Sequence, residues 1–312
     1  MKARDRYLAR YAERERAFPV ATETRTIVTG SGDTYLRICG PQDGPPLVLL
    51  PSASATSLFW SPNMESLSAV FRVYALDNIY DFGRSVYKRP MKTPDDLTDW
   101  LEEVLEALGL REGVGMMGLS YGAWLTARYA IRFPRRLRGV VLIAPPATIR
   151  ELPGAWAWYG LSALIPHRHF MMNLTRWMFP VLTRRTDEAS VRLVNDLVDD
   201  AFLGLGCFKL KMLVAPTVLS DEEIRKLSEV PTLFMVGEHE VVYPAQEAVR
   251  RLGEVAPGIR AAVIPGAGHD LTFVQADMVD RMAIDFLVAV EPSSILVVDE
   301  SSGKSERIKI PV

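Results

Sequence analysis

A serine between two glycines is the feature that most constrains the fold of this chain. The segment Gly118–Gly122 reads Gly-Leu-Ser-Tyr-Gly and lies between a strand pattern at Val114–Met117 and a helix pattern at Tyr121–Phe133. A serine on a sharp turn from strand to helix needs glycines two residues before and after it, because larger side chains would keep the backbone from closing. Such a turn lifts the hydroxyl out of the sheet edge. The sequence therefore predicts that Ser120 is a nucleophile on an elbow of this kind.

The rest of the chain alternates between strand and helix patterns. Short, continuously apolar runs, typical of parallel strands buried on both faces, are Leu47–Leu50, Phe71–Leu76, Val114–Met117, Gly139–Ile143, Thr232–Val236 and Ala261–Ile264. Before them, Thr26–Val28 and Tyr35–Ile38 flank a Gly- and Asp-containing turn and predict a hairpin. A helix is expected from Thr93 to Leu108, with Gly109 after its end. This alternation indicates an α/β fold with a mostly parallel sheet and helices on both faces.

Four segments are expected from the change of pattern along the chain. Residues 1–147 and 231–291 would form the α/β core. Residues 148–230 are helical in character and rich in large apolar side chains, which favours a lid over the functional edge of the sheet rather than an ordinary helical subdomain. Residues 292–312 form a C-terminal tail, either a hairpin of Ile295–Val298 with Arg307–Ile310 or a disordered end. Within the core segment, residues 1–18 have helical composition without a strong apolar face and are expected to form an N-terminal arm.

A serine hydroxyl is a weak nucleophile at neutral pH and needs a base beside it. Of the four histidines, His269 follows a strand pattern and comes after Ser120 in the chain, so it is the candidate base. His167 and His169 lie in the predicted lid and are expected at its surface. The base in turn needs a carboxylate to hold its tautomer. Glu240 is the first candidate, with Glu238 in the same loop as the alternative.

Composition excludes several classes of protein. The formal net charge of −2 and the pI near 6.2 give no basic footprint for a nucleic-acid partner. No apolar run is long enough to span a bilayer, and the charged first 16 residues do not resemble a secretory signal. Two distant cysteines indicate free thiols in a reducing compartment. A cytoplasmic protein is therefore expected, without a membrane partner, a metal or a cofactor.

The elbow at Ser120, the Gly-Glu-His-Glu loop at 237–240 and the Gly-Ala-Gly-His loop at 266–269 together resemble the α/β-hydrolase superfamily, in its lidded, esterase-like branch. The segment Asp77–Ser85 also resembles the superfamily after its fourth strand. The resemblance covers about Ile27 to Val290. It implies an eight-stranded, mostly parallel sheet with the lid inserted after strand six, and a Ser–His–acid triad.

The resemblance also implies an oxyanion hole made by backbone N–H groups of Tyr121 and Ala53. Two departures from the superfamily pattern occur. Many relatives have aspartate where Glu240 stands, and many have His-Gly where this chain has Pro51–Ala55. A backbone donor survives a change of side chain, so the oxyanion hole is still expected.

The sequence thus predicts a serine hydrolase that cleaves a small or medium apolar carboxylic ester through an acyl-enzyme on Ser120. The same three residues would serve a C–C bond hydrolase or a perhydrolase. A non-catalytic, ligand-binding protein of the same fold is the alternative from another class. A small apolar molecule is the expected partner, and assembly into a homo-oligomer is left open.

Overall fold

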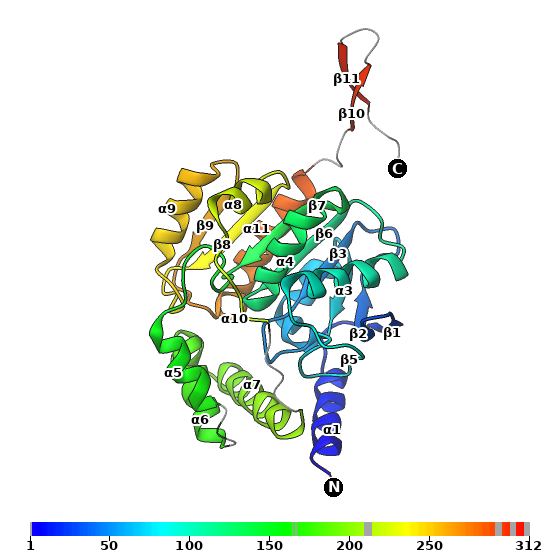
Figure 1. Cartoon of the computed structure of the whole chain (residues 1–312). Coiled ribbons are helices and arrows are strands. Elements are labelled where there is room, and N and C mark those ends of the chain that lie inside the picture. Colours follow the sequence, from blue (N-terminus) through cyan, green and yellow to red (C-terminus); the bar gives the residue numbers. More distant parts are fainter. Residues whose placement is uncertain are drawn as a thin grey trace.

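A single large β-sheet forms the centre of the protein (Figure 1). The computed structural model describes residues 2–163, 165, 167–208, 214–290, 295–299 and 304–308. The strands are β1 (Glu23–Val28), β2 (Gly32–Cys39), β3 (Pro46–Leu50), β4 (Arg72–Leu76), β5 (Val86–Tyr87), β6 (Val114–Leu119), β7 (Leu137–Ile143), β8 (Thr232–Gly237) and β9 (Arg260–Ile264). Their order is β1-β2-β4-β3-β6-β7-β8-β9, with β5 paired to β2. All pairs from β4 to β9 are parallel, while β2 is antiparallel to its neighbours.

This sheet confirms the predicted fold class, including the path of eight strands and the hairpin of β1 and β2. The sequence patterns missed β5. It is only two residues long and pairs with the start of β2, so it leaves no periodicity in the sequence.

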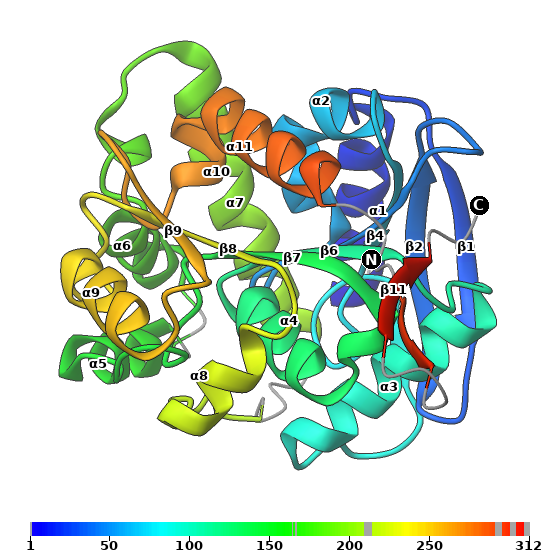
Figure 2. The same cartoon turned by 90° about the horizontal axis from the view of Figure 1, so that it is seen from above.

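Helices cover both faces of the sheet (Figure 2). One face carries α2 (Met64–Ser68) and α11 (Ala276–Ala289), and the other carries α3 (Pro94–Ala107), α4 (Tyr121–Arg132), α8 (Asp221–Leu227) and α9 (Ala245–Val255). In β3, Val48 and Leu50 belong to the cluster on the α3–α4 side, while Leu47 and Leu49 pack on the α2–α11 side. Because both faces are buried, every position of such a strand must be apolar.

A helical insertion between β7 and β8 forms the cap, which we define as α5 (Gly154–Ala163), α6 (Arg168–Met178), the short 3-10 turn Leu182–Arg184 and α7 (Glu188–Cys207). It follows the sixth strand of the eight-strand path. The helices of the cap lie beyond the edge of the sheet at which the parallel strands end (Figure 1). That the cap acts as a lid stays a prediction.

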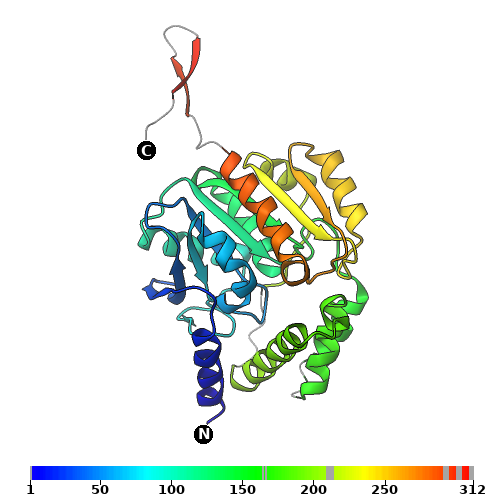
Figure 3. The same ribbon diagram turned by 180° about the vertical axis from the view of Figure 1, so that it is seen from behind.

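The N-terminal segment is not a free arm. It forms α1 (Ala3–Arg16), which lies beside α7 at the same end of the molecule (Figures 1 and 3). Tyr7 and Tyr11 are each 3% exposed and carry its buried face. Because most of the remaining residues of the helix are charged, the sequence shows no continuous apolar stripe, and the expectation of an arm was wrong.

At the C-terminus, β10 (Ile295–Asp299) pairs antiparallel with β11 (Lys304–Ile308). The second strand begins three residues before the expected Arg307, and the remainder of that predicted strand, residues 309 and 310, lies outside the described residues. No helix in the described part of the chain is both long and apolar enough to cross a bilayer.

A buried carboxyl on α11 predicts a pH-dependent stability. Asp280 is 1% exposed and accepts a hydrogen bond from Asn63 Nδ2 at 2.8 Å. Burial raises the pKa of Asp280 to about 7, although the bond from Asn63 opposes the rise. The folded state therefore binds this proton more tightly than the unfolded state, and the contribution of Asp280 to stability falls as pH rises from about 4 through about 7.

The variant Asp280→Asn is expected to remove this loss. Its free energy of unfolding, from urea titrations, should exceed that of the wild type by about 4 kcal/mol at pH 8, since the pKa rises by about three units and each unit corresponds to ~1.4 kcal/mol. The difference should shrink toward pH 5. A difference that stays constant from pH 5 to pH 8 would show that Asp280 does not titrate in this range.

Candidate functional site

Ser120 lies on a strained turn between β6 and α4. Its φ of 53° and ψ of −121° place it in a backbone region that a residue with a side chain rarely adopts. A Cβ atom at Gly118 would collide with the carbonyl of Gly122, and one at Gly122 would collide with the carbonyl oxygen of Leu50. Both glycines are therefore required by close backbone contacts. The backbone around Ser120 has the conformation that the sequence predicts for an elbow.

His269 and Glu240 form a buried pair. Nδ1 of His269 lies 2.9 Å from Oε2 of Glu240, and the two side chains are 1% and 0% exposed. The other carboxylate oxygen, Oε1, accepts the N–H groups of Val241 and Val242, each at 2.9 Å. These bonds fix the carboxylate, which in turn fixes the imidazole. Within the described residues, Nε2 of His269 has no hydrogen-bond partner.

Glu238 lies elsewhere. Its side chain is half exposed, and its Oε2 accepts the N–H of Gly266 at 3.0 Å. The structure thus brings Glu240, and not Glu238, to His269. The other histidines are exposed: His167 and His169 are in the cap, and His239 lies beside Glu238. The catalytic role of Glu240 stays a prediction.

Ser120, Glu240 and His269 lie at one edge of the sheet. Ser120 follows β6, Glu240 follows β8 and His269 follows β9, and these strands run parallel. The carboxyl ends of parallel strands meet at one edge, where open α/β sheets bind their ligands. This is also the edge that the cap faces (Figure 1).

The cap is joined to the loop of His269. The ring of Phe179 is stacked on the imidazole, with centroids 6.4 Å apart and an interplanar angle of 12°. Asp270, which is fully buried, accepts the N–H of Gly268 at 2.9 Å and that of Leu182 at 2.7 Å. One carboxylate therefore holds the histidine loop and the cap together. The sequence patterns did not identify Phe179 or Asp270, because neither belongs to a motif.

The loop after β3 carries the predicted oxyanion donor. In the described part of the chain, no hydrogen bond engages the backbone N–H of Ala53 or of Tyr121, so both remain available as donors. Two side chains from the loop after β4 hold this segment. Asn78 Nδ2 donates to the carbonyl of Ser52 at 3.4 Å, and Ser54 N–H donates to Asp81 Oδ2 at 2.5 Å. Asp81 lies in the segment Asp77–Ser85, which resembles the superfamily in sequence, but the sequence did not predict this role for it.

Asp81 is expected to affect activity in a pH-dependent way. Burial raises the pKa of Asp81 to about 7, against the opposing N–H groups of Ser54 and Phe82. Above this pH both oxygens accept N–H groups. Below this pH, one carboxyl oxygen carries a proton and becomes a poorer acceptor for its N–H group.

The variant Asp81→Asn has one acceptor fewer at any pH, so kcat/KM at pH 8.5 is expected to be about tenfold below the wild type, the equivalent of one hydrogen bond. At pH 5.5 the wild type is impaired in the same way, and the ratio of the two should approach one. The exposed Asp43→Asn serves as the control. A ratio that does not change with pH would contradict the role of Asp81 in holding the loop.

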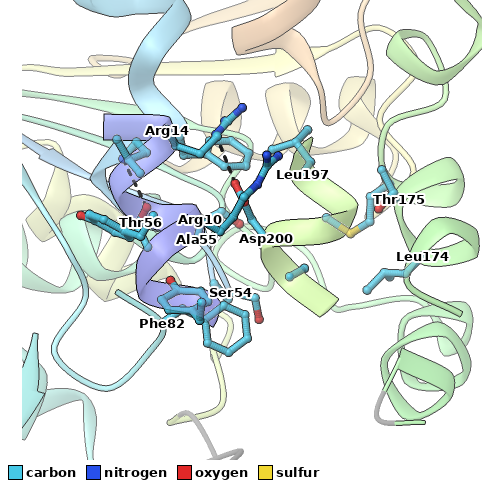
Figure 4. Close-up of a pocket in the computed structure, with 18 of the residues that line it drawn as sticks. Arg10, Arg14, Ser54, Ala55, Thr56, Phe82, Leu174, Thr175, Leu197 and Asp200 are labelled. Carbon is cyan, nitrogen blue, oxygen red and sulfur yellow. Dashed lines mark hydrogen bonds and ion pairs between the residues drawn. The ribbon is translucent and has the colours of Figure 1, made fainter. Parts of the chain in front are cut away.

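A cavity of about 130 Å³ adjoins this loop (Figure 4). Four parts of the chain line it: α1, the loop and 3-10 turn after β3, Phe82 from the loop after β4, and helices of the cap together with Phe179. Neither Ser120 nor His269 is among the described residues that line this cavity. Ala53 and Phe179 line the cavity and lie near them, because Ala53 is the expected oxyanion donor and the ring of Phe179 lies 6.4 Å from the imidazole. The described residues contain no cluster of three His, Cys, Asp or Glu side chains suited to hold a metal ion.

Comparison with known proteins agrees with this geometry. The sequence model of the alpha/beta hydrolase family matches residues 47–283. The chain is 30% identical to the uncharacterized carboxylesterase nap of Bacillus subtilis (strain 168), over 91% of this chain and 93% of that protein. The crystal structure of naproxen esterase (carboxylesterase NP) from Bacillus subtilis superimposes with a TM-score of 0.83 at 30% identity, covering 92% of this chain and 98% of that one. A 2-hydroxy-6-oxo-2,4-heptadienoate hydrolase of Pseudomonas putida is 27% identical over 85% of this chain and 96% of its own length.

Proposed function

Because the chain belongs to the alpha/beta hydrolase family, we propose that it is a serine-dependent carboxylic ester hydrolase with Ser120 as nucleophile, His269 as base and Glu240 as the acid. One observation carries this proposal. A buried imidazole is held by a buried carboxylate at Nδ1, while Nε2 has no partner within the described residues, at the sheet edge where Ser120 occupies a strained turn. A structural histidine so deeply buried would use both ring nitrogens.

In the proposed reaction, His269 Nε2 takes the proton of the Ser120 hydroxyl as its oxygen attacks the ester carbonyl. The tetrahedral intermediate carries its negative charge on the former carbonyl oxygen. Collapse transfers the proton from His269 to the departing alcohol and leaves an acyl-enzyme. Water, deprotonated by the same imidazole, then attacks the acyl-enzyme, and the imidazolium returns the proton to the departing Ser120 oxygen as the acid is released.

Glu240 supports both steps. Its carboxylate accepts the Nδ1 proton of His269, so that the neutral imidazole presents a lone pair at Nε2. It also stabilises the imidazolium that forms when Nε2 takes the serine proton. The N–H groups of Val241 and Val242 hold the carboxylate in place throughout.

The oxyanion is proposed to bind to the backbone N–H groups of Ala53 and Tyr121. Tyr121 is the first residue of α4, so its N–H points out of the helix N-terminus, where the dipole also favours negative charge. Asp81 and Asn78 position the loop that supplies Ala53. One such donor contributes about 3 kcal/mol to the transition state of a serine protease.

The substrate is proposed to be a small or medium apolar ester, bound under the cap as a lid. Apolar and aromatic side chains line most of the cavity beside the oxyanion loop, and two carboxylesterases of Bacillus subtilis are among its relatives. A cytoplasmic location is also proposed. Cys39 and Cys207 are both free thiols, which a reducing compartment would maintain.

Hydrolysis of p-nitrophenyl butyrate tests the proposal. We expect turnover with a burst of p-nitrophenol when acylation is faster than deacylation. The comparison substrate is 2-hydroxy-6-oxo-2,4-heptadienoate, the compound in the name of the Pseudomonas putida relative. Its hydrolysis breaks a C–C bond instead of an ester bond. Faster cleavage of that substrate would move the assignment to a C–C bond hydrolase with the same residues, and binding without turnover of either would indicate a ligand-binding protein.

A further inference from the structure

The helix α1 lies between the α/β core and helix α7 of the cap and is bonded to both. On its inner side, Tyr11 donates a hydrogen bond to Asp77 Oδ2 at 2.8 Å, at the end of β4. Glu15 forms ion pairs with the fully buried Arg37 at 2.8 Å and with Arg84 at 3.0 Å. These bonds fix one side of the helix to the α/β core.

On its outer side, α1 is joined to α7 by four ion pairs. Arg10 and Arg14 each contact both Asp196 and Asp200, with Nε of Arg10 3.3 Å from Asp200 Oδ1 and Nε of Arg14 3.4 Å from Asp200 Oδ2. The side chains are between 17% and 32% exposed. Two positive and two negative charges make this cluster neutral as a whole.

Three of these four residues, Arg10, Arg14 and Asp200, also line the cavity beside the oxyanion loop. Figure 4 shows Arg10 and Arg14 of α1, with Asp200 of α7, around the space that Ser54 and Leu197 also border. Most of the cavity wall is thus apolar, and one end carries charged side chains that are paired with one another. Its volume of about 130 Å³ is close to that of an engineered apolar cavity of about 150 Å³ that binds benzene.

We propose that α1 is a substrate-binding element and that this cavity holds the acyl group of the ester, with Asp200 as a specificity-determining residue. The proposal rests on the proposed esterase function and names the acyl group that this site accepts. The acyl group stays attached to the carbonyl carbon through both chemical steps, so it remains beside Ala53, which borders the cavity. A group the size of one ring or a six-carbon chain fits. Because Asp196 and Asp200 neutralise both arginines, an uncharged acyl group is preferred over an anionic one.

The isosteric variant Asp200→Asn tests this inference by a gain of function. It removes one negative charge and leaves Asp196 and the exposed Glu13 as the carboxylates paired with these arginines, neither of which lines the cavity, so this end of the cavity becomes positive. The probes are p-nitrophenyl hexanoate and its anionic counterpart, the mono-p-nitrophenyl ester of adipic acid, each corrected for uncatalysed hydrolysis. We expect the ratio of kcat/KM, anionic over neutral, to rise at least fivefold over the wild type at low ionic strength and to fall again in 0.5 M salt.

The matched control is Asp99→Asn, which likewise removes one carboxylate from an arginine: Asp99 of α3 lies 2.8 Å from Arg132 of α4, outside the cavity. This variant should leave the ratio unchanged. A ratio within twofold of the wild type in Asp200→Asn, with hexanoate still hydrolysed, would overturn the subsite but not the esterase function. Absence of hexanoate hydrolysis by the wild-type protein would contradict both.

A second variant keeps the inference testable if Asp200→Asn does not fold. Ala201 lines the cavity from α7, and Ala201→Phe would fill it. In this variant, the ratio of kcat/KM for p-nitrophenyl hexanoate over p-nitrophenyl acetate is expected to fall at least fivefold below that of the wild type. An unchanged ratio would show that the acyl chain does not enter this cavity.

Discussion

Replacement of Ser120 by alanine is expected to lower kcat for p-nitrophenyl butyrate on the order of 10⁶-fold, to a rate measurable only with concentrated protein. The reason is chemical. Without the hydroxyl no acyl-enzyme forms, and only binding and the oxyanion donors still accelerate the attack of water. The folded structure should persist, because alanine fits the space of serine and the strained turn is held by the packing around Gly118 and Gly122. Circular dichroism and the thermal midpoint should therefore stay close to those of the wild type.

The control is Ser228→Ala, at the exposed end of α8, where the hydroxyl donates to the carbonyl of Arg225. This variant is expected to keep wild-type turnover. If Ser120→Ala retained more than about a tenth of the activity, the nucleophile would be another residue or a water molecule, and the acyl-enzyme mechanism would be wrong.

Replacement of Glu240 by glutamine is expected to lower kcat about 10⁴-fold, as the corresponding change does in a serine protease. The amide keeps the shape of the carboxylate but not its charge. Oε1 accepts the N–H groups of Val241 and Val242, so the amide oxygen is expected to take that position and the NH₂ group to face His269 Nδ1. The imidazole would then carry its proton on Nε2, where it cannot act as a base.

Glu238→Gln is the matched control, two residues away in the same loop. Its carboxylate is half exposed and bonds only to Gly266 N–H among the described residues, with His239 at 3.9 Å. We expect turnover within threefold of the wild type. Wild-type turnover in Glu240→Gln together with a large loss in Glu238→Gln would transfer the acid role to Glu238.

The sequence predicted the sheet well for a physical reason. Strands such as Leu47–Leu50 are buried on both faces, so each is a continuous apolar run that stands out from the helices around it. The helix α3 starts at Pro94, directly after its N-cap residue Thr93, which forms a capping box with Asp96. These residue types are typical of a helix start and can be recognised in the sequence. Where structure depends on contacts between distant segments, such patterns are absent. The strand β5 exists only because β2 lies beside it.

The same distinction explains what could be predicted of the site. The elbow at Ser120 and the loops of Glu240 and His269 are local motifs, and each follows a recognisable strand. Asp81 and the helix α1 reach the site only through tertiary packing. One usable signal was present: Tyr7 and Tyr11 are one helical turn apart, and two large side chains at that spacing favour a buried face.

Covalent labelling tests the central claim most directly. A fluorophosphonate reacts with an activated serine and remains attached to its oxygen, so digestion and mass spectrometry identify the modified residue. We expect one adduct per chain, on the peptide that contains Ser120, at a rate that falls strongly in His269→Ala. An adduct on any other residue, or labelling of Ser120 at an unchanged rate without His269, would contradict the account.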